Sequence, residues 1–106
     1  MDDSCQELKK FLDIMDKLLG PDGCEWDRKQ THKSLIPYLL EEAHEVVEAI
    51  NEEDFEQLQD ELGDLLLHIV FQAKLSEKEN RFKFKDSIRS IREKMIRRHP
   101  HVFSDV

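Results

Sequence analysis

The chain has 106 residues, of which 24 are acidic and 16 are basic, so its formal net charge at pH 7 is −8. This length favours a single domain, residues 1–106, and charged residues make up 38% of it, which leaves no apolar run of about 18 residues to span a membrane. No charged-then-apolar leader opens the sequence, and two cysteines are too few for a disulfide scaffold. We therefore expect a cytoplasmic protein with free thiols.

The first half of the chain predicts two helices. Apolar side chains recur at helical spacing over about residues 5–19, and the Gly-Pro-Asp-Gly segment at 20–23 ends this helix. A loop follows. Thr31 is a suitable N-cap for a second helix that ends near residue 50, in which Pro37 is tolerated only close to the first turns.

The second half predicts two more helices. A turn or cap at residues 51–54 precedes a long helix at about 55–78, and a connection over 80–85 leads to a fourth helix at about 86–98. No segment has a convincing strand pattern. Four such helices predict an all-α fold, a four-helix antiparallel bundle. Because its core would be thin, we expect homo-oligomerisation, as a dimer or larger, to complete it.

The negative charge is concentrated in one block of the sequence. Residues 41–64 contain eleven acidic side chains and no Lys or Arg, whereas the net charge is −2 before this block and +5 after it. An acidic block repels a phosphate backbone, which argues against nucleic acid as a partner. The block could be a solvated surface, or it could hold cations.

A helical wheel gives the acidic side chains of the two middle helices the same position. With Glu42 at zero, the apolar side chains of its helix cover about 40–160°, and Glu45 lies about 60° on the other side. With Glu61 at zero, the apolar side chains of its helix cover about 40–140°, and Asp64 again lies about 60° on the other side. Two such pairs at the margins of packed helices would converge and repel each other, so a cation is needed to neutralise them.

Oxygen ligands without cysteine fit a hard divalent ion, Mg²⁺ or Mn²⁺. Ordinary surface charge is the alternative, because acidic pairs at this spacing are common on exposed helices. In the basic tail, Lys94 and Arg98 share one helix face. A carboxylate-held metal that faces this pair suits a polyphosphate, although cations at a helix end also stabilise the helix dipole.

Three other side chains have competing interpretations. His44 follows Glu41 at the spacing of di-iron bundles, but it faces away from the carboxylates. His68 lies one turn after Asp64, where it could support a metal ligand or be an ordinary half-buried histidine. Trp26 could stack on a nucleobase or anchor the core or an interface.

Several short motifs also occur in order along the chain. They are Cys24-Glu25-Trp26-Asp27-Arg28, Gln30-Thr31-His32, Ser34-Leu35, Tyr38-Leu39-Leu40, the carboxylate pattern EExxE…ExxD at 41–64, and the ending at 93–103. Together, from about Leu8 onward, they resemble the MazG-like nucleoside triphosphate pyrophosphohydrolases, which are all-α enzymes. Glu25 departs from the family pattern, which usually has proline between the cysteine and the tryptophan.

The resemblance implies Mg²⁺-dependent cleavage of nucleoside triphosphates between the α and β phosphorus, and a role in cleaning the nucleotide pool. The metal ligands that it implies are Glu42, Glu45, Glu61 and Asp64, with Glu41 beside them as a catalytic carboxylate that binds a second ion or orients water. The substrate contacts that it implies are Tyr38, Gln57, Asp60, Lys94 and Arg98. The alternative function is a non-catalytic helical module that binds a metal or a partner.

Overall fold

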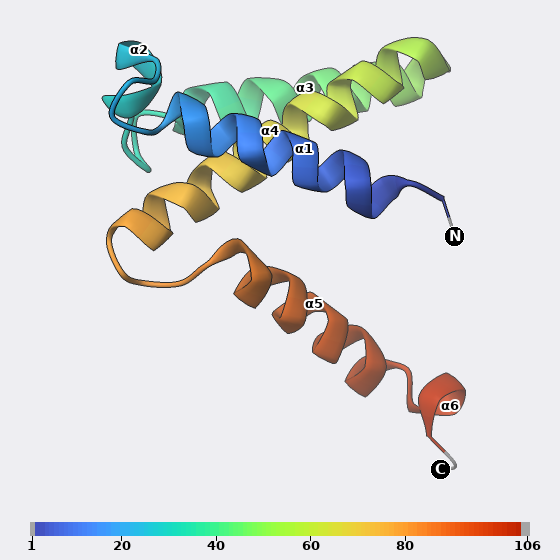
Figure 1. Ribbon diagram of the computed structural model, residues 1–106. Helices are drawn as coiled ribbons and strands as arrows, with labels where there is room; N and C mark the ends of the chain where they lie inside the picture. The colour runs from blue at the N-terminus through green and yellow to red at the C-terminus, as the bar shows by residue number, and fades with distance from the viewer. Residues whose placement is uncertain (1, 105–106) are drawn as a thin grey trace.

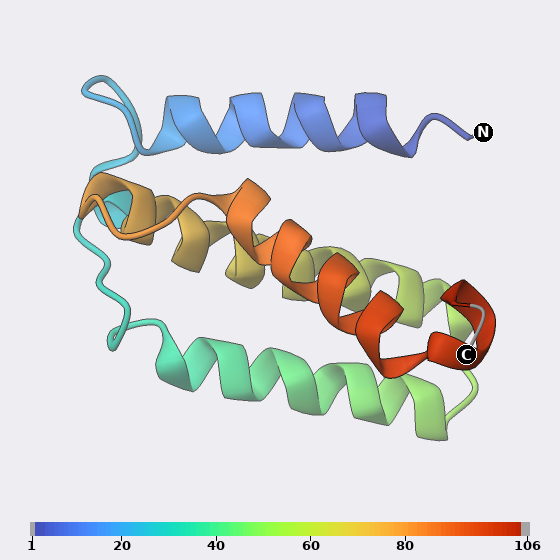
Figure 2. The same cartoon turned by 90° about the horizontal axis from the view of Figure 1, so that it is seen from below.

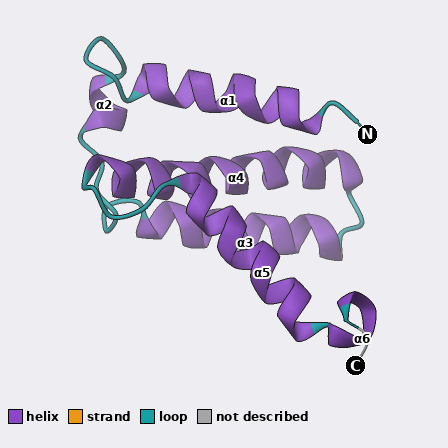
Figure 3. Ribbon diagram, turned by 60° about the horizontal axis from the view of Figure 1, so that its bottom comes forward, coloured by secondary structure: helices purple, strands orange, loops and turns teal. Residues whose placement is uncertain are grey.

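The computed structural model describes residues 2–104, and all regular secondary structure in this part of the chain is α-helical (Figure 3). The all-α prediction is confirmed. The four long helices are α1 (Ser4–Leu18), α3 (Ile36–Asn51), α4 (Phe55–Lys78) and α5 (Phe84–Arg98). The two single-turn helices are α2 (Glu25–Arg28) and α6 (Pro100–Phe103). Within residues 2–104, no helix combines the length and the apolar character needed to cross a membrane.

The central element is α4, which the other three long helices all contact. Only residues 52–54 separate α3 from α4, so the two helices pack as antiparallel neighbours, and this pair has the largest interface. On another side of α4 lies α1, which runs in the same direction as α4 (Figure 2). Helix α5 starts near the C-terminal end of α4 and extends away from the other three (Figure 1).

The helix boundaries follow local capping interactions. Helix α4 has the boundaries predicted from the sequence, and Asp54 caps it by accepting a hydrogen bond from the backbone N–H of Gln57 at 3.1 Å. Helix α5 begins two residues earlier than predicted, because the backbone N–H of Lys83 donates to the carboxylate of Asp86 at 2.9 Å and closes the first turn there.

Helix α3 starts at Ile36, so the prediction that Thr31 is its N-cap is wrong. Thr31 and Ser34 instead bind each other: the Thr31 N–H donates to Ser34 Oγ at 2.8 Å, and the Ser34 N–H donates to Thr31 Oγ1 at 3.0 Å. This closed turn competes with helix formation. Pro37 consequently lies in the first turn of α3, where proline is tolerated. The segment around Trp26, predicted as a loop, forms α2.

The buried apolar core is small and lies where α1, the start of α3 and the second half of α4 meet. Its buried members are Met15, Leu35, Val70, Phe71 and Leu75. Toward the other end of α3 and α4, burial involves one side of the pair, and large apolar side chains on the opposite side remain exposed.

These exposed side chains share one side of each of the two helices. On the wheel they lie about 80–160° from Glu42 and about 80–120° from Glu61, in the outer part of the predicted apolar arcs. Leu40 is 66% exposed and Phe55 is 71% exposed. We call this surface the outer apolar face; its members are Ile36, Leu40, Val47, Ile50, Phe55, Leu62 and Ile69.

A close approach of two backbone segments fixes the turn between α1 and α2. The Cys24 N–H donates to the carbonyl oxygen of Leu18 at 2.8 Å. This contact brings Gly23 against the end of α1, and a Cβ atom at Gly23 would lie 2.0 Å from the Leu18 oxygen. The residue at 23 must therefore be glycine.

Replacing Gly23 with alanine should lower the free energy of unfolding by about 1–3 kcal/mol, because the backbone of α1 would have to move. Gly63, in the interior of α4, is the matched control, since nothing lies within 4 Å of a Cβ there. Gly63→Ala should raise the stability by about 0.5–1 kcal/mol. Urea unfolding followed by circular dichroism measures both variants, and equal effects would contradict the close approach.

Candidate metal centre

Three carboxylates converge between α3 and α4. Glu42 and Glu45 lie one turn apart on α3, and Glu61 lies on the facing side of α4. One carboxylate oxygen from each lies within 4.8 Å of the others. The antiparallel pairing of α3 and α4 brings the positions 42 and 61 to the same level, so the structure brings together three of the four side chains predicted as metal ligands.

The two central carboxylates are inside the helix interface. Glu42 is 8% exposed and Glu61 is 6% exposed. The helical wheel predicted that both would lie at the margin of an apolar face, but they lie inside the interface between the two helices. Among the described residues, Glu42 Oε1 is buried without a hydrogen-bond partner. A buried, unpartnered carboxylate oxygen is costly unless a ligand satisfies it.

The electrostatics of the cluster are those of a site that lacks positive charge. The pKa of Glu42 is raised from 4.5 to about 7, first by burial, then by the nearby charge of Glu61, and also by a hydrogen bond with Glu45 and the charge of Asp64. A divalent cation would stabilise the ionised carboxylates and oppose this rise in pKa, and the oxygen-only donor set fits a hard ion such as Mg²⁺ or Mn²⁺. The residues present therefore fit a metal ion.

The remaining acidic candidates lie at the edge of the cluster. Asp64 is exposed, one turn after Glu61 on α4, and it is close enough for its charge to raise the pKa of Glu42. Glu41 is exposed beside Glu42. The metal-binding role of Asp64 and the catalytic role of Glu41 stay predictions.

The predicted nucleotide contacts lie on opposite sides of the cluster. Tyr38 precedes Glu42 by one turn on α3, whereas Gln57 precedes Glu61 by one turn on the antiparallel α4. Tyr38 and Gln57 are therefore about 12 Å apart along the helix pair. Asp60 is exposed beside Glu61. A base that contacts Tyr38 would therefore not reach Gln57.

The predicted phosphate contacts are not next to the cluster within one chain. Lys94 and Arg98 lie on α5, the helix that extends away from α1, α3 and α4 (Figure 1). Among the ion pairs of residues 2–104, none joins either side chain to a carboxylate of the cluster. Their role as phosphate contacts stays a prediction.

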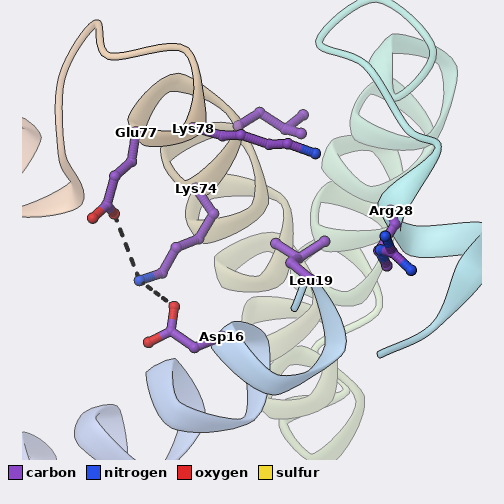
Figure 4. Close-up of a pocket in the computed structure, with 7 residues that line it drawn as sticks. Asp16, Leu19, Arg28, Lys74, Glu77 and Lys78 are labelled. Carbon is purple, nitrogen blue, oxygen red and sulfur yellow. Dashed lines mark ion pairs between the residues drawn. The ribbon is translucent and has the colours of Figure 1, made fainter. Parts of the chain in front are cut away.

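A cavity of about 300 Å³ with cationic side chains lies elsewhere, between α1, α2 and the end of α4 (Figure 4). Lys74, which lies at this cavity, points to two carboxylates: it pairs with Asp16 at 2.7 Å and with Glu77 at 3.8 Å. Because both partners are carboxylates, the charge of Lys74 is already neutralised. The ion pair between Lys74 and Asp16 ties α4 to α1.

His68 and Trp26 are the two remaining side chains for which the sequence leaves competing interpretations. His68 is half-buried, and its Nδ1 atom is buried without a partner in the described part of the chain. Trp26, considered as a core anchor, is 54% exposed and meets the ring of Tyr38 edge-on at a centroid distance of 6.1 Å. The wheel placed His68 on the stripe of Asp64, but the position of Trp26 depends on the tertiary fold.

Comparison with known proteins places these features in one family. Residues 30–103 match the MazG nucleotide pyrophosphohydrolase domain. The chain is 53% identical over 97 residues to the nucleoside triphosphate pyrophosphohydrolase/pyrophosphatase MazG of Thermotoga maritima, a match that covers 92% of this chain and 38% of that protein. It is 48% identical over 100 residues to the nucleoside triphosphate pyrophosphohydrolase of Escherichia coli, covering 93% and 38%.

A further relative is the uncharacterized protein YabN of Bacillus subtilis, which is 51% identical over 100 residues, covering 94% of this chain and 20% of that protein. The chain thus spans about two fifths or less of the length of these curated relatives.

The raised pKa of Glu42 predicts a pH-dependent stability in the presence of a chelator. Since this pKa is about 7 in the folded chain and 4.5 ordinarily, the folded state holds the extra proton between these values. Stability from this group is therefore fully present below about pH 4.5 and is lost as the pH rises through about 7. Glu42→Gln should remove this loss. The free energy of unfolding of the variant should therefore rise relative to that of the wild type between about pH 5 and about pH 8.

Urea unfolding at both pH values measures this gain, and Glu52→Gln, at an exposed position at the end of α3, is the control that should follow the wild type. Parallel pH profiles for Glu42→Gln and the wild type would contradict the burial of an unneutralised carboxylate.

Proposed function

The chain belongs to the MazG nucleotide pyrophosphohydrolase domain family, and on this premise we propose that it hydrolyses nucleoside triphosphates to nucleoside monophosphates and pyrophosphate. Water would add across the bond between the α and β phosphorus, in a reaction that depends on a divalent metal. The observation that supports this function is the convergence of Glu42, Glu45 and Glu61, with a buried oxygen that lacks a partner. The names of the relatives from Thermotoga maritima and Escherichia coli support the reaction class.

The residues that would hold the metal are Glu42, Glu45, Glu61 and Asp64. Mg²⁺ is the ion we propose, because it binds through carboxylates and substrate phosphates together, and Mn²⁺ has the same ligand preference. When bound, such an ion polarises phosphoryl oxygens and lowers the pKa of water.

The side chains of the chain itself would orient the reactants and neutralise charge. Glu41, exposed beside Glu42, would accept a proton from the attacking water. Lys94 and Arg98 would donate hydrogen bonds to the pyrophosphate as negative charge develops on it. Positioning and charge neutralisation suffice for this chemistry, so no covalent nucleophile is needed.

We further propose that the active form is a homodimer or a larger homo-oligomer. The outer apolar face leaves seven large apolar side chains exposed to water, more than an isolated domain with such a small core would keep uncovered. The occupant we propose is a second copy, because a two-fold axis lets one apolar face cover its equivalent. In such an assembly, Lys94 and Arg98 on the extended α5 would face a carboxylate cluster.

The biological role that we propose is the removal of unwanted nucleoside triphosphates from the cytoplasmic nucleotide pool. Neither nucleic acid nor a membrane is part of this proposal, because the acidic block repels both phosphate backbones and anionic surfaces.

The reaction is tested by incubating the protein with a panel of nucleoside triphosphates and Mg²⁺ and measuring pyrophosphate. The wild type should release pyrophosphate and stop when a chelator removes the metal. Glu42→Gln and Asp64→Asn should each lower the rate more than about 100-fold, since even residues that only orient metal ligands contribute 10–100-fold. Glu52→Gln is the exposed control.

All variants should keep the helical circular dichroism spectrum of the wild type. Release of orthophosphate in place of pyrophosphate would contradict the proposed cleavage site, and the absence of product with every nucleotide would favour a non-catalytic binding module.

The assembly is tested by placing a charge on the outer apolar face. Val47→Glu should shift the protein from dimer to monomer in sedimentation velocity at micromolar concentration, because a carboxylate would be buried in the interface. Ile14, an exposed apolar residue on α1 outside this face, provides the control, and Ile14→Glu should remain dimeric. A monomeric wild type would contradict the proposal.

A further inference from the structure

A cavity of about 280 Å³ lies beside the candidate metal centre, where α1, α2, α3 and α4 meet. Trp26 and Asp27 of α2, Tyr38 of α3 and His68 and Phe71 of α4 line it. The volume lies near the lower limit of about 300 Å³ for small-molecule pockets, which suits one flat ring system better than a whole nucleotide. The lining combines aromatic side chains with two polar groups, as ligand pockets commonly do.

We propose that this cavity binds the nucleobase of the substrate, with the carboxylate of Asp27 selecting bases that carry an amino group. The proposal rests on the proposed function, because it assigns the substrate's phosphates to the neighbouring carboxylate cluster.

The cavity has the right position relative to that cluster. Tyr38 lies one turn before Glu42 on α3, and His68 lies one turn after Asp64 on α4. Because the two helices are antiparallel, both steps lead in the same direction from the cluster. The cavity therefore begins about 5–6 Å along the helix axes from the carboxylates, a distance that the sugar and the α-phosphate can bridge.

The aromatic side chains offer a stacking surface. Trp26 is 54% exposed and Tyr38 is 49% exposed, although the two rings contact each other edge-on at 6.1 Å. In an edge-on contact the edge of one ring meets one face of the other, so the remaining ring faces are not used by this contact. Every nucleobase can stack on such a face, whatever its identity, so stacking would supply affinity for any nucleotide.

The polar groups offer a means of discrimination. His68 Nδ1 is buried and has no partner within residues 2–104, which indicates that a group absent from the chain itself satisfies it. Asp27 is half-buried, and its carboxylate takes part in none of the hydrogen bonds or ion pairs of the described residues. The adjacent Arg28 does not neutralise it, since Arg28 donates to the carbonyl oxygen of Pro21 at 3.0 Å.

An ionised carboxylate only accepts hydrogen bonds. At this position it would accept from the exocyclic amino group of adenine, cytosine or guanine. Uracil and thymine offer only a ring N–H that lies between two carbonyl oxygens, and these oxygens would repel the carboxylate. The expected preference is therefore for amino-bearing bases.

Trp26 is the single tryptophan of the chain, so its fluorescence reports directly on this cavity. Adenosine monophosphate, added with a chelator present, should quench or shift this fluorescence. Tripolyphosphate with Mg²⁺ should not, although it should inhibit hydrolysis by competing for the cluster. An unchanged tryptophan signal with adenosine monophosphate would overturn the proposal.

Kinetics provide the second measurement. Trp26→Ala should raise KM for adenosine triphosphate about 10-fold and leave kcat nearly unchanged, whereas Trp26→Phe, which keeps a ring, should resemble the wild type. The inhibition constant of tripolyphosphate should be the same in all three proteins. Unchanged KM in Trp26→Ala would contradict stacking in the cavity.

The role of Asp27 is tested by comparing two substrates. Asp27→Asn should raise KM for adenosine triphosphate and leave KM for uridine triphosphate unchanged or lower, and equal effects on both would contradict base selection. Failure of the proposed function looks different: adenosine monophosphate would still change the fluorescence of Trp26, but no triphosphate would yield pyrophosphate. Active enzyme with a silent tryptophan would overturn only the base site.

Discussion

The repulsion among buried carboxylates is the constraint on which the rest of this structure depends. Glu42 and Glu61 occupy the seam between α3 and α4, the position where an ordinary helix pair would place leucine or alanine. Burial without a counter-charge is severe enough to raise the pKa of Glu42 to about 7. A helix pair with acids at its centre is therefore unfavourable alone and becomes favourable when a cation is bound, so ligand binding and folding are linked at this site.

The burial of these carboxylates also explains why so much apolar surface is exposed to water. Because the acidic side chains take the inner positions of α3 and α4, the apolar arcs of both helices are rotated outward, and Leu40, Val47 and Leu62 are about half exposed or more. The compact core is displaced to the other end of the pair, around Met15 and Val70. The chain thus separates a buried carboxylate cluster, an outer apolar face and a small packed core, and assembly would cover the outer apolar face.

The sequence determines local features of this arrangement well and tertiary features less well. The boundaries of α4 and its Asp54 cap follow from periodicity and capping chemistry, and the pairing of Glu42 with Glu61 follows from two antiparallel amphipathic helices. The start of α3 was missed because Thr31 and Ser34 satisfy each other in a turn, which an isolated cap rule does not foresee. The helical wheel gives the angles between side chains within one helix, but only the packing of α1 and α2 shows which of these side chains face the interior of the fold. The course of α5 depends on long-range contacts, so the sequence could not place Lys94 and Arg98.

The segment around α2 is where a common phosphate site would acquire its base preference, because carboxylates and a metal recognise every triphosphate alike. Its one departure from the family pattern, Glu25, fits this division. Glu25 is the first residue of α2, a position that favours proline for its fixed φ and an acid for the helix dipole. Its carboxylate pairs with Lys29 at 3.0 Å on the exposed side of α2, so the exchange keeps the turn helical. Trp26 and Asp27 can therefore line the cavity whether proline or glutamate starts the turn.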